Sequence, residues 1–395
     1  MGLIGVLAFV VALLTSVMIH EAGHYFTAKS FGMKVTEFFL GFGKRIWSTQ
    51  RGETEFGIKA IPAGGYCRIV GMSASEELSE GDANRAFYKA SAPKRLIVLG
   101  AGSFLHFAIG FFLIFLIFFS VGTASLTSTV DQVVPCINAN NAACTSTSVP
   151  SPAKAAGIIP GDKFTAINGY PVSDWYTDIN VVRNSPGKVN IFSIKRGNEQ
   201  LDIPIASIPH KVNGKTIGML GVLNKIGMAR APFSTSLSRS WELSRNLFTG
   251  SITSLTQLPS KVPALVRQTF GNEVRDPAGL VGVIGVAEAS AQTAGNASLG
   301  WNERIGTFLL IIASLNIFVG IFNLLPLLPL DGGHMAIAII DGLRNVWARI
   351  RRRPNPRPIH VESLTPLTLV VFVFLVGLSL LLLAADIFNP VHFNL

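Results

Sequence analysis

The stretch Met18-Ile19-His20-Glu21-Ala22-Gly23-His24 closes an apolar run that begins at Gly2 and holds no charged residue before Glu21. Residues i and i+4 share one face of a helix, so His20 and His24 direct two imidazoles to one point. Glu21 lies beside that point, where it can take a proton from a metal-bound water. Ionisable groups are costly in so long an apolar segment, and this favours a functional site over polar residues packed in a helix bundle.

The composition is that of a membrane protein. Of its 395 residues, 49% are hydrophobic and only 14% are charged, which is unusual for a soluble protein. The formal net charge is +10. In a membrane protein this excess indicates cytoplasmic loops and contact with lipid head groups, and it gives no reason to expect nucleic acid as a partner.

The sequence predicts a polytopic α-helical membrane protein with four transmembrane helices. They are expected at residues 1–27, 94–122, 305–333 and 364–388. Lys and Arg crowd the segment 28–93 and the loop 334–363, whereas residues 123–138 and the tail 389–395 hold neither. The positive-inside rule therefore predicts that the two basic segments are cytoplasmic and that both termini are extracytoplasmic.

The cytoplasmic segment is expected to contain a β-hairpin. Residues 54–61 alternate at period two, Pro62-Ala63-Gly64-Gly65 has the composition of a turn, and residues 66–70 form the returning strand. A hairpin near the active-site end of the first helix could offer an edge to an unwound substrate, with Gly64, Gly65 and Tyr66 as substrate-binding residues. A purely structural hairpin is the alternative.

Residues 123–209 are expected to form an extracytoplasmic α+β domain. A short helix from Ser151, a Pro-Gly-Asp turn at 160–162, a strand and an Asn-Gly turn precede a helix that Ser173 could cap, and a hairpin over 189–205 follows. These elements resemble a PDZ domain, which would bind a peptide by strand addition. The alternative is a lid or size filter without a ligand of its own.

The rest of the outer region, residues 210–304, is expected to be interfacial. An amphipathic pattern over 234–270, interrupted by Pro259 and Pro263, suits a helix lying in the interface. The apolar stretch Gly279–Ala287 has no role that its residues reveal. Cys136 and Cys144 lie close together on the outer side, where a disulfide is plausible.

The third span ends in Asn323-Leu324-Leu325-Pro326-Leu327-Leu328-Pro329-Leu330-Asp331-Gly332-Gly333. The prolines and the glycine pair break a helix. Because this span runs from outside to inside, it brings Asp331 to the depth of His20 and His24. A His-His-Asp set leaves a fourth tetrahedral position for water, as in catalytic zinc sites. A simple helix end is the alternative, but it leaves Asn323 and Asp331 unexplained.

These motifs resemble the site-two protease family of intramembrane zinc metalloproteases, of the RseP-like type. The motifs of the resemblance occur in the same order along the chain. Short motifs such as Gly41-Phe42-Gly43 and Gly64-Gly65-Tyr66 make the chain similar to actinobacterial members in particular. It implies a bacterial cell membrane protein that holds Zn2+ through His20, His24 and Asp331. It also implies Glu21 as base and Asn323 as a hydrogen-bonding catalytic residue.

The resemblance further implies regulated intramembrane proteolysis, in which a single-span membrane protein, often an anti-sigma factor, is cleaved after another protease has removed its outer domain. One departure concerns the second span. The family commonly carries Gly-Pro-x-x-Asn there, whereas this chain has Gly102-Ser103-Phe104-Leu105-His106. His106 is either a further zinc ligand or a residue of the bundle interior.

Two other classes of function are compatible with parts of the sequence. The chain could be a membrane-anchored PDZ-type binding module with an inactive or structural metal site. Glu21 argues against this, because a structural site gains nothing from a base beside its metal. A transporter is the third option, but four spans without an evident internal repeat support it poorly.

Overall fold

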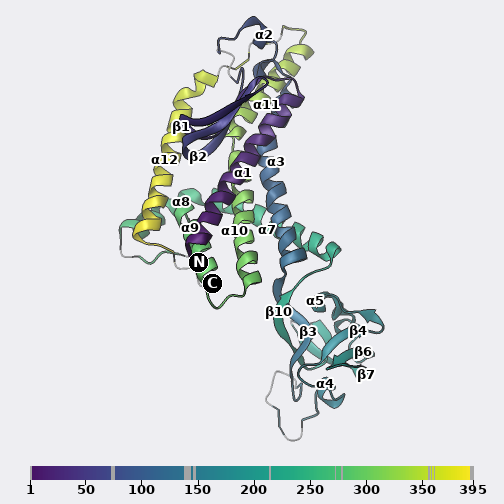
Figure 1. Ribbon diagram of the computed structural model, residues 1–395. Coiled ribbons are helices and arrows are strands. Elements are labelled where there is room, and N and C mark those ends of the chain that lie inside the picture. The colour runs from purple at the N-terminus through teal and green to yellow at the C-terminus, as the bar shows by residue number, and fades with distance from the viewer. Residues whose placement is uncertain are drawn as a thin grey trace. The chain divides into compact units, whose positions relative to one another are not determined.

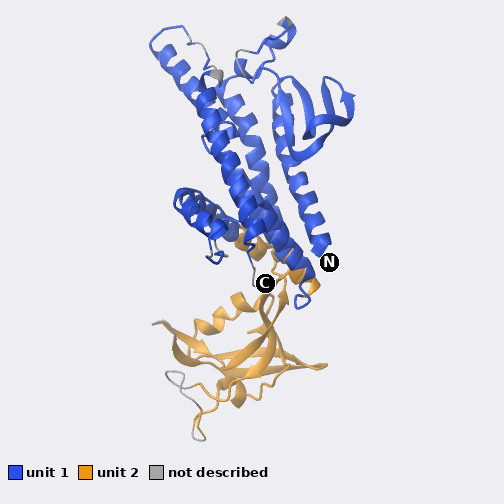
Figure 2. Ribbon diagram, turned by 90° about the vertical axis from the view of Figure 1, so that its left-hand side faces the viewer, with its two compact units in different colours: residues 1–114, 241–299, 307–395 blue, residues 115–240, 300–306 orange. Residues whose placement is uncertain are grey.

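The computed structural model describes residues 2–72, 76–137, 144–145, 148–212, 215–271, 273–276, 279–354, 356, 358–359 and 361–391. Parts of the predicted segments, among them tail residues 392–395 and residues 138–143 of the PDZ-like region, lie outside these. The chain divides into two compact units, coloured in Figure 2. We name residues 1–114, 241–299 and 307–395 the helical unit, and residues 115–240 and 300–306 the sheet unit.

Four helices among the described residues are long and apolar enough to cross a membrane, as the sequence predicts (Figure 1). They are α1 (Gly2–Ser30), α3 (Ala92–Leu116) with its π-helical extension (Ile117–Val121), α10 (Trp301–Asn323) and α12 (Thr365–Phe388). At 1.5 Å per residue even α10 is about 35 Å long, more than the hydrocarbon core of a bilayer. A helix satisfies its backbone N–H and C=O groups with its own hydrogen bonds, which matters here because lipid tails offer these groups no partner.

Small residues let the helices of the helical unit approach closely. A Cβ added at Gly23 of α1 would lie 2.9 Å from the Ala101 carbonyl of α3. A Cβ added at Gly110 of α3 would lie 2.7 Å from Cγ1 of Ile317 in α10. Helices in lipid associate through such close packing, because burying apolar surface from lipid gains little. The contacts hold α1, α3 and α10 together.

The predicted hairpin exists, but its turn is elsewhere. Strands β1 (Val35–Arg51) and β2 (Thr54–Ile69) pair antiparallel around a turn at residues 52–53. The prediction that residues 62–65 form the turn is wrong, because they lie inside β2. Both strands bend, so that Leu40 of β1 pairs with Ile58 and also with Gly65.

An ion-pair cluster anchors the true turn to the end of α1. The Arg85 guanidinium donates to both Glu53 carboxylate oxygens, at 2.6 and 2.7 Å, and Lys29 in the last turn of α1 also pairs with Glu53. Hydrogen bonding from Arg85, assisted by Lys29, lowers the pKa of Glu53 to about 2. The turn is thereby tied to the helix that carries the two histidines.

The third span is shorter than predicted. Helix α10 ends at Asn323, before Pro326 and Pro329. The seven residues 324–330 form a break, after which α11 (Asp331–Ile350) begins. The prediction that 334–363 is a loop is therefore wrong over its first half, since α11 continues to Ile350. An acidic residue in the first turn favours this helix start through the helix dipole.

The segment 210–304, predicted to be interfacial, instead gives its first residues, up to 240, to the sheet unit, and its described residues after Ala229 are mainly helical. The predicted amphipathic pattern forms α7 (Phe233–Thr256) and α8 (Leu258–Phe270), which accommodates Pro259 in its first turn and Pro263 inside. The stretch without an assigned role holds the start of α9 (Val283–Gly295), which packs on the N-terminal half of α1. The Asp386 carboxylate of α12 accepts from the Gly285 amide at 2.8 Å and so caps α9. Short helices complete the unit: α2 (Glu80–Ala83), η1 (Phe87–Lys89) and η4 (Val361–Leu364).

The sheet unit contains an antiparallel sheet with the strand order β10-β3-β4-β6-β7, in which β5 pairs with β4. Strands β8 and β9 form a separate two-stranded ribbon. The strands are β3 (Thr123–Val133), β4 (Lys163–Ile167), β5 (Tyr170–Pro171), β6 (Val189–Arg196), β7 (Glu199–Ala206), β8 (Ile208–Val212), β9 (Lys215–Met219) and β10 (Val222–Ala229). The predicted strands and the Asn-Gly turn at 168–169 are present. Phe164, Trp175 and Phe192 pack together in the core.

Two further expectations for this unit can be compared with the structure. Cys136 and Cys144 form a disulfide. The helix expected from Ser173 to about Arg183 is instead two short helices, α5 (Trp175–Asp178) and α6 (Asn180–Arg183), after α4 (Pro152–Ala155). Ser173 does not cap, because Asp174 holds the N-cap position and the Asp178 carboxylate accepts from the Ser173 amide.

Candidate active site

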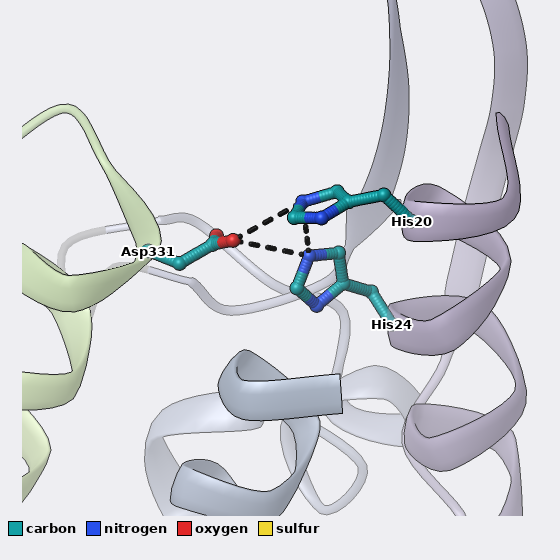
Figure 3. A group of neighbouring side chains, drawn as sticks. All are labelled: His20, His24 and Asp331. Carbon is teal, nitrogen blue, oxygen red and sulfur yellow. Dashed lines mark hydrogen bonds and ion pairs between the residues drawn. The ribbon is translucent and has the colours of Figure 1, made fainter. Parts of the chain in front are cut away.

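His20 and His24 lie on one buried face of α1 and meet Asp331 from the start of α11 (Figure 3). Oδ2 of Asp331 lies 3.2 Å from Nε2 of His20 and 3.3 Å from Nε2 of His24. The two Nε2 atoms are 3.1 Å apart. The helical spacing brings the imidazoles together, and the carboxylate reaches them from more than 300 residues away in the sequence.

The glycine pair after Asp331 explains how the broken segment places the carboxylate. A Cβ added at Gly332 would lie 2.2 Å from the Leu325 carbonyl oxygen, and one at Gly333 would lie 2.6 Å from the Leu328 amide nitrogen. Segment 324–330 therefore folds back directly onto the first turn of α11. Only residues without side chains permit this approach, which sets the position of Asp331.

The neighbouring face of α3 shapes the other side of the group. The Val98 carbonyl oxygen lies 2.8 Å from Nδ1 of His24. Because a carbonyl only accepts, Nδ1 of His24 carries a proton, and in the neutral ring the Nε2 lone pair is then available to a metal ion shared with Asp331. A Cβ added at Gly102 would lie 2.5 Å from Nδ1 of His20 and 2.7 Å from Nε2 of His24, so the imidazoles fill the space that this glycine leaves.

The three donor atoms suit a zinc ion. Zinc binds His nitrogen and carboxylate oxygen at about 2.0–2.2 Å, so two donors at adjacent tetrahedral positions lie roughly 3.3 Å apart. The observed separations of 3.1, 3.2 and 3.3 Å agree with that value. His20 and His24 are each 6% exposed, so the group is shielded from solvent. Three protein ligands leave one position free, as in catalytic zinc sites.

Glu21 is half-buried next to His20, and β2 approaches it. A Cβ added at Gly65 would lie 3.0 Å from Cγ of Glu21 and 3.0 Å from the sulfur of Met18. This close contact is the physical reason for glycine at a position that looks like a turn in the sequence. The backbone of β2 therefore runs beside the candidate base.

The other residues predicted to bind substrate are placed differently. Gly64 packs against the Phe42 ring, where an added Cβ would lie 3.1 Å from it. The Tyr66 hydroxyl hydrogen-bonds to Glu37 and Lys59 within the sheet. Asn323 is the half-buried last residue of α10. Within the described part of the chain, its amide makes no hydrogen bond to His20, His24 or Asp331.

His106 does not join the group of donor atoms in the described residues, which consists of His20, His24 and Asp331. Its ring centroid lies 4.9 Å from that of His20, and Nδ1 bonds to Asn316 Oδ1 at 2.8 Å. The sequence reading missed Asn316 and its partner Ser16. A signal was available: both are polar residues in apolar spans, and Ser16 precedes His20 by one helical turn.

Comparison with known proteins adds an independent line of support. The Peptidase family M50 profile matches residues 8–361. The chain is 35% identical over 403 residues to the zinc metalloprotease Rip1 of Mycobacterium tuberculosis. It is 36% and 33% identical over 408 residues to proteins of the same name from Mycobacterium bovis and Mycolicibacterium smegmatis. Each alignment covers 98% of both chains. The resemblance seen in the sequence is confirmed: this multi-pass chain belongs to peptidase family M50 and is an intramembrane zinc metalloprotease.

Proposed function

We propose that this protease hydrolyses a peptide bond within or near the transmembrane segment of single-span membrane proteins, with anti-sigma factors as the expected substrate class. His20, His24 and Asp331 hold the zinc ion, and Glu21 is the catalytic base. The observation that carries this proposal is the meeting of three donor atoms at 3.1–3.3 Å with Glu21 beside them.

Each residue has a defined chemical task. Zinc held by the three ligands would polarise the scissile carbonyl and make water more acidic. Glu21 accepts a proton from the attacking water and returns one to the leaving amine. Because Glu21 directly follows His20, its carboxylate stays close to the zinc ligands during both proton transfers. A base here has no use in a purely structural metal site, which argues against the binding-module alternative.

The substrate must reach this group in an extended form, because a helix hides its carbonyls in its own hydrogen bonds. The backbone of β2 at Gly64 and Gly65 runs beside Glu21 and offers an extended template, which Tyr66 stiffens through its ring and hydroxyl contacts. Asn323, the last residue of α10 before the break at 324–330, is assigned the role of a hydrogen-bonding residue for the substrate. Strand pairing would then present one peptide bond to Glu21.

The sheet unit is assigned the role of a PDZ-like domain on the extracytoplasmic side, with both termini of the chain on that side as well. Its sheet ends at β7 on one edge and β10 on the other. An edge strand offers unpaired backbone groups to an extended peptide or a free C-terminus. A lid or filter without a ligand is the alternative, and titration with C-terminal peptides separates the two.

The test of the proteolytic function uses the full chain, purified in detergent and incubated with candidate single-span proteins that lack their outer domains. We expect cleavage that a zinc chelator stops and added zinc restores. Glu21→Gln is expected to keep its zinc and lose cleavage by at least about 100-fold, the usual scale for general base catalysis. Turnover by Glu21→Gln at the wild-type rate would refute the assignment of the base.

A further inference from the structure

The two imidazoles of the candidate zinc site differ in how their second nitrogen is held. Nδ1 of His24 donates to the Val98 carbonyl at 2.8 Å. Nε2 of His20 faces Asp331 and His24, so its ring proton belongs on Nδ1. That Nδ1 is fully buried and has no hydrogen-bond partner among the described residues. Metal-binding histidines almost always donate this proton, and a buried donor without an acceptor is costly.

A buried polar chain from three helices ends next to this nitrogen. It consists of Ser16 of α1, Asn316 of α10 and His106 of α3, which are 7%, 1% and 3% exposed. The Asn316 amide nitrogen donates to the Ile312 carbonyl at 2.8 Å and lies 3.1 Å from the Ser16 hydroxyl. Because Ile312 offers only an acceptor, the orientation of the Asn316 amide follows from this contact.

This orientation determines the tautomer of His106. Oδ1 of Asn316 lies 2.8 Å from Nδ1 of His106 and can only accept, so Nδ1 of His106 carries the proton. In the neutral ring Nε2 of His106 is then an acceptor. Its ring centroid is 4.9 Å from that of His20, and the planes are tilted by 37°. The chain thus supplies an acceptor next to a donor that lacks one.

Helix α3 is built to bring these rings together. Gly102 lies four residues before His106, on the same face of the helix. A Cβ added at Gly102 would lie 2.5 Å from Nδ1 of His20, so the Nδ1 edge of His20 faces this side of α3. A rival acceptor is the hydroxyl of Ser103, which is also buried without a partner among the described residues.

We propose that His106 is a positioning residue for the zinc site: with the metal bound, a small rotation of the two neighbouring rings lets Nε2 of His106, oriented through Asn316 and Ser16, accept the Nδ1 proton of His20 and hold that imidazole with Nε2 toward the metal. The inference rests on the proposed function, in which His20 is a zinc ligand. Such partners fix the tautomer and ring orientation of the ligand, and their loss typically costs 10–100-fold in metal affinity.

The test compares two substitutions that retain different halves of the imidazole. In His106→Gln the side-chain oxygen reaches the place of Nε2, whereas in His106→Asn it reaches only the place of Nδ1. Zinc affinity of the full chain in detergent is measured by competition with a chromophoric chelator. We expect His106→Asn and His106→Leu to bind zinc about 10–100-fold more weakly and His106→Gln to stay within about threefold of wild type.

Matched controls separate this inference from packing and from the proposed function. Phe107→Leu, the next residue of α3, is expected to bind zinc as wild type, and so is Ser103→Ala. Size-exclusion elution identifies any variant that does not fold. In that case Asn316→Leu, which is expected to weaken zinc binding as His106→Leu does, is used in place of the unfolded variant.

Zinc binding by His20→Ala equal to wild type would refute the ligand set itself. If His20→Ala loses zinc while His106→Asn and His106→Leu retain wild-type affinity, only the positioning role is wrong. It is also wrong if His106→Gln binds as weakly as His106→Asn, or if Ser103→Ala has the large effect.

Discussion

Gly102 shows how a single hydrogen atom in place of a side chain decides whether the site can form. The space that its Cβ would occupy is filled by both imidazoles, at 2.5 Å from Nδ1 of His20 and 2.7 Å from Nε2 of His24. Two residues earlier, Gly100 has only the Met335 methyl group nearby, at 3.9 Å. The two glycines look alike in the sequence, and only their surroundings separate them.

Gly102→Ala is therefore expected to lower zinc affinity and proteolysis by at least about tenfold, because the new methyl group displaces the ligand imidazoles. Gly100→Ala is the matched control and should behave as wild type. Zinc competition and a cleavage assay measure both. Equal zinc affinity of the two variants would contradict the packing of α3 against the imidazoles.

At the scale of elements, the hairpin is held in place by charge as well as by packing. The carboxylate of Glu53 in the turn receives Arg85 and Lys29, and hydrogen bonding from Arg85 lowers its pKa from 4.5 to about 2. A depressed carboxyl pKa stabilises the folded state above the unfolded pKa. The contribution is complete above about pH 4.5 and is lost as the pH falls through about 2.

Glu53→Gln is expected to destabilise the protein by about 1 kcal/mol at pH 7, the upper end for a partly exposed ion pair. The difference from wild type should shrink as the pH falls from about 4.5 to about 2, because the Glu53 carboxyl of the unfolded chain takes up a proton in this range while that of the folded chain stays ionised. Thermal unfolding in detergent at several pH values measures it. Glu77→Gln, at an exposed position, is the control, and a pH-independent difference for Glu53→Gln would show that the ion pair is not its source.

The broken end of α10 is the second element on which the site depends. Gly332→Ala places a methyl group 2.2 Å from the Leu325 carbonyl oxygen, so segment 324–330 or the start of α11 must move. A displacement of about 1 Å at a catalytic group can cost roughly 100-fold in rate, and we expect a loss of that order. Gly377→Ala in α12, where no atom lies within 4 Å, should leave cleavage unchanged.

At the scale of the whole molecule, the proposed topology makes a prediction about accessibility. Arg51→Cys, at the end of β1, should react with a membrane-impermeant maleimide only after the cells are permeabilised, because the positive-inside rule places the basic segment in the cytoplasm. Asn198→Cys, in the turn between β6 and β7, should react in intact cells. Burial raises the pKa of the free Cys67 thiol well above its usual range, so Cys67 should stay unlabelled. Labelling of Arg51→Cys in intact cells would overturn the topology.

The sequence by itself determined what depends on local periodicity and composition. Four apolar runs indicated the membrane helices, since a span needs about 20 apolar residues wherever it occurs. His20 and His24 could be paired from their spacing alone, because i and i+4 share a face in every helix. Strands β4 to β7 of the sheet unit and the Asn-Gly turn followed from period-two alternation and turn composition, whereas β3 and β8 to β10 were not predicted.

Apart from Asp331, which the direction of the third span brings to the depth of the histidines, tertiary structure alone decided which residues at distant positions meet. Gly64-Gly65 has the composition of a turn, yet both residues lie inside strand β2, where Gly65 contacts Glu21 of α1. The turn of the hairpin is at Gly52. The pairing of His106 with Asn316, and of Asn316 with Ser16, could not be identified because Asn316 and Ser16 lie 210 and 90 residues away from His106. Local rules describe how a segment bends, whereas such contacts follow from the packing of α1, α3 and α10, where close approach decides which side chain fits.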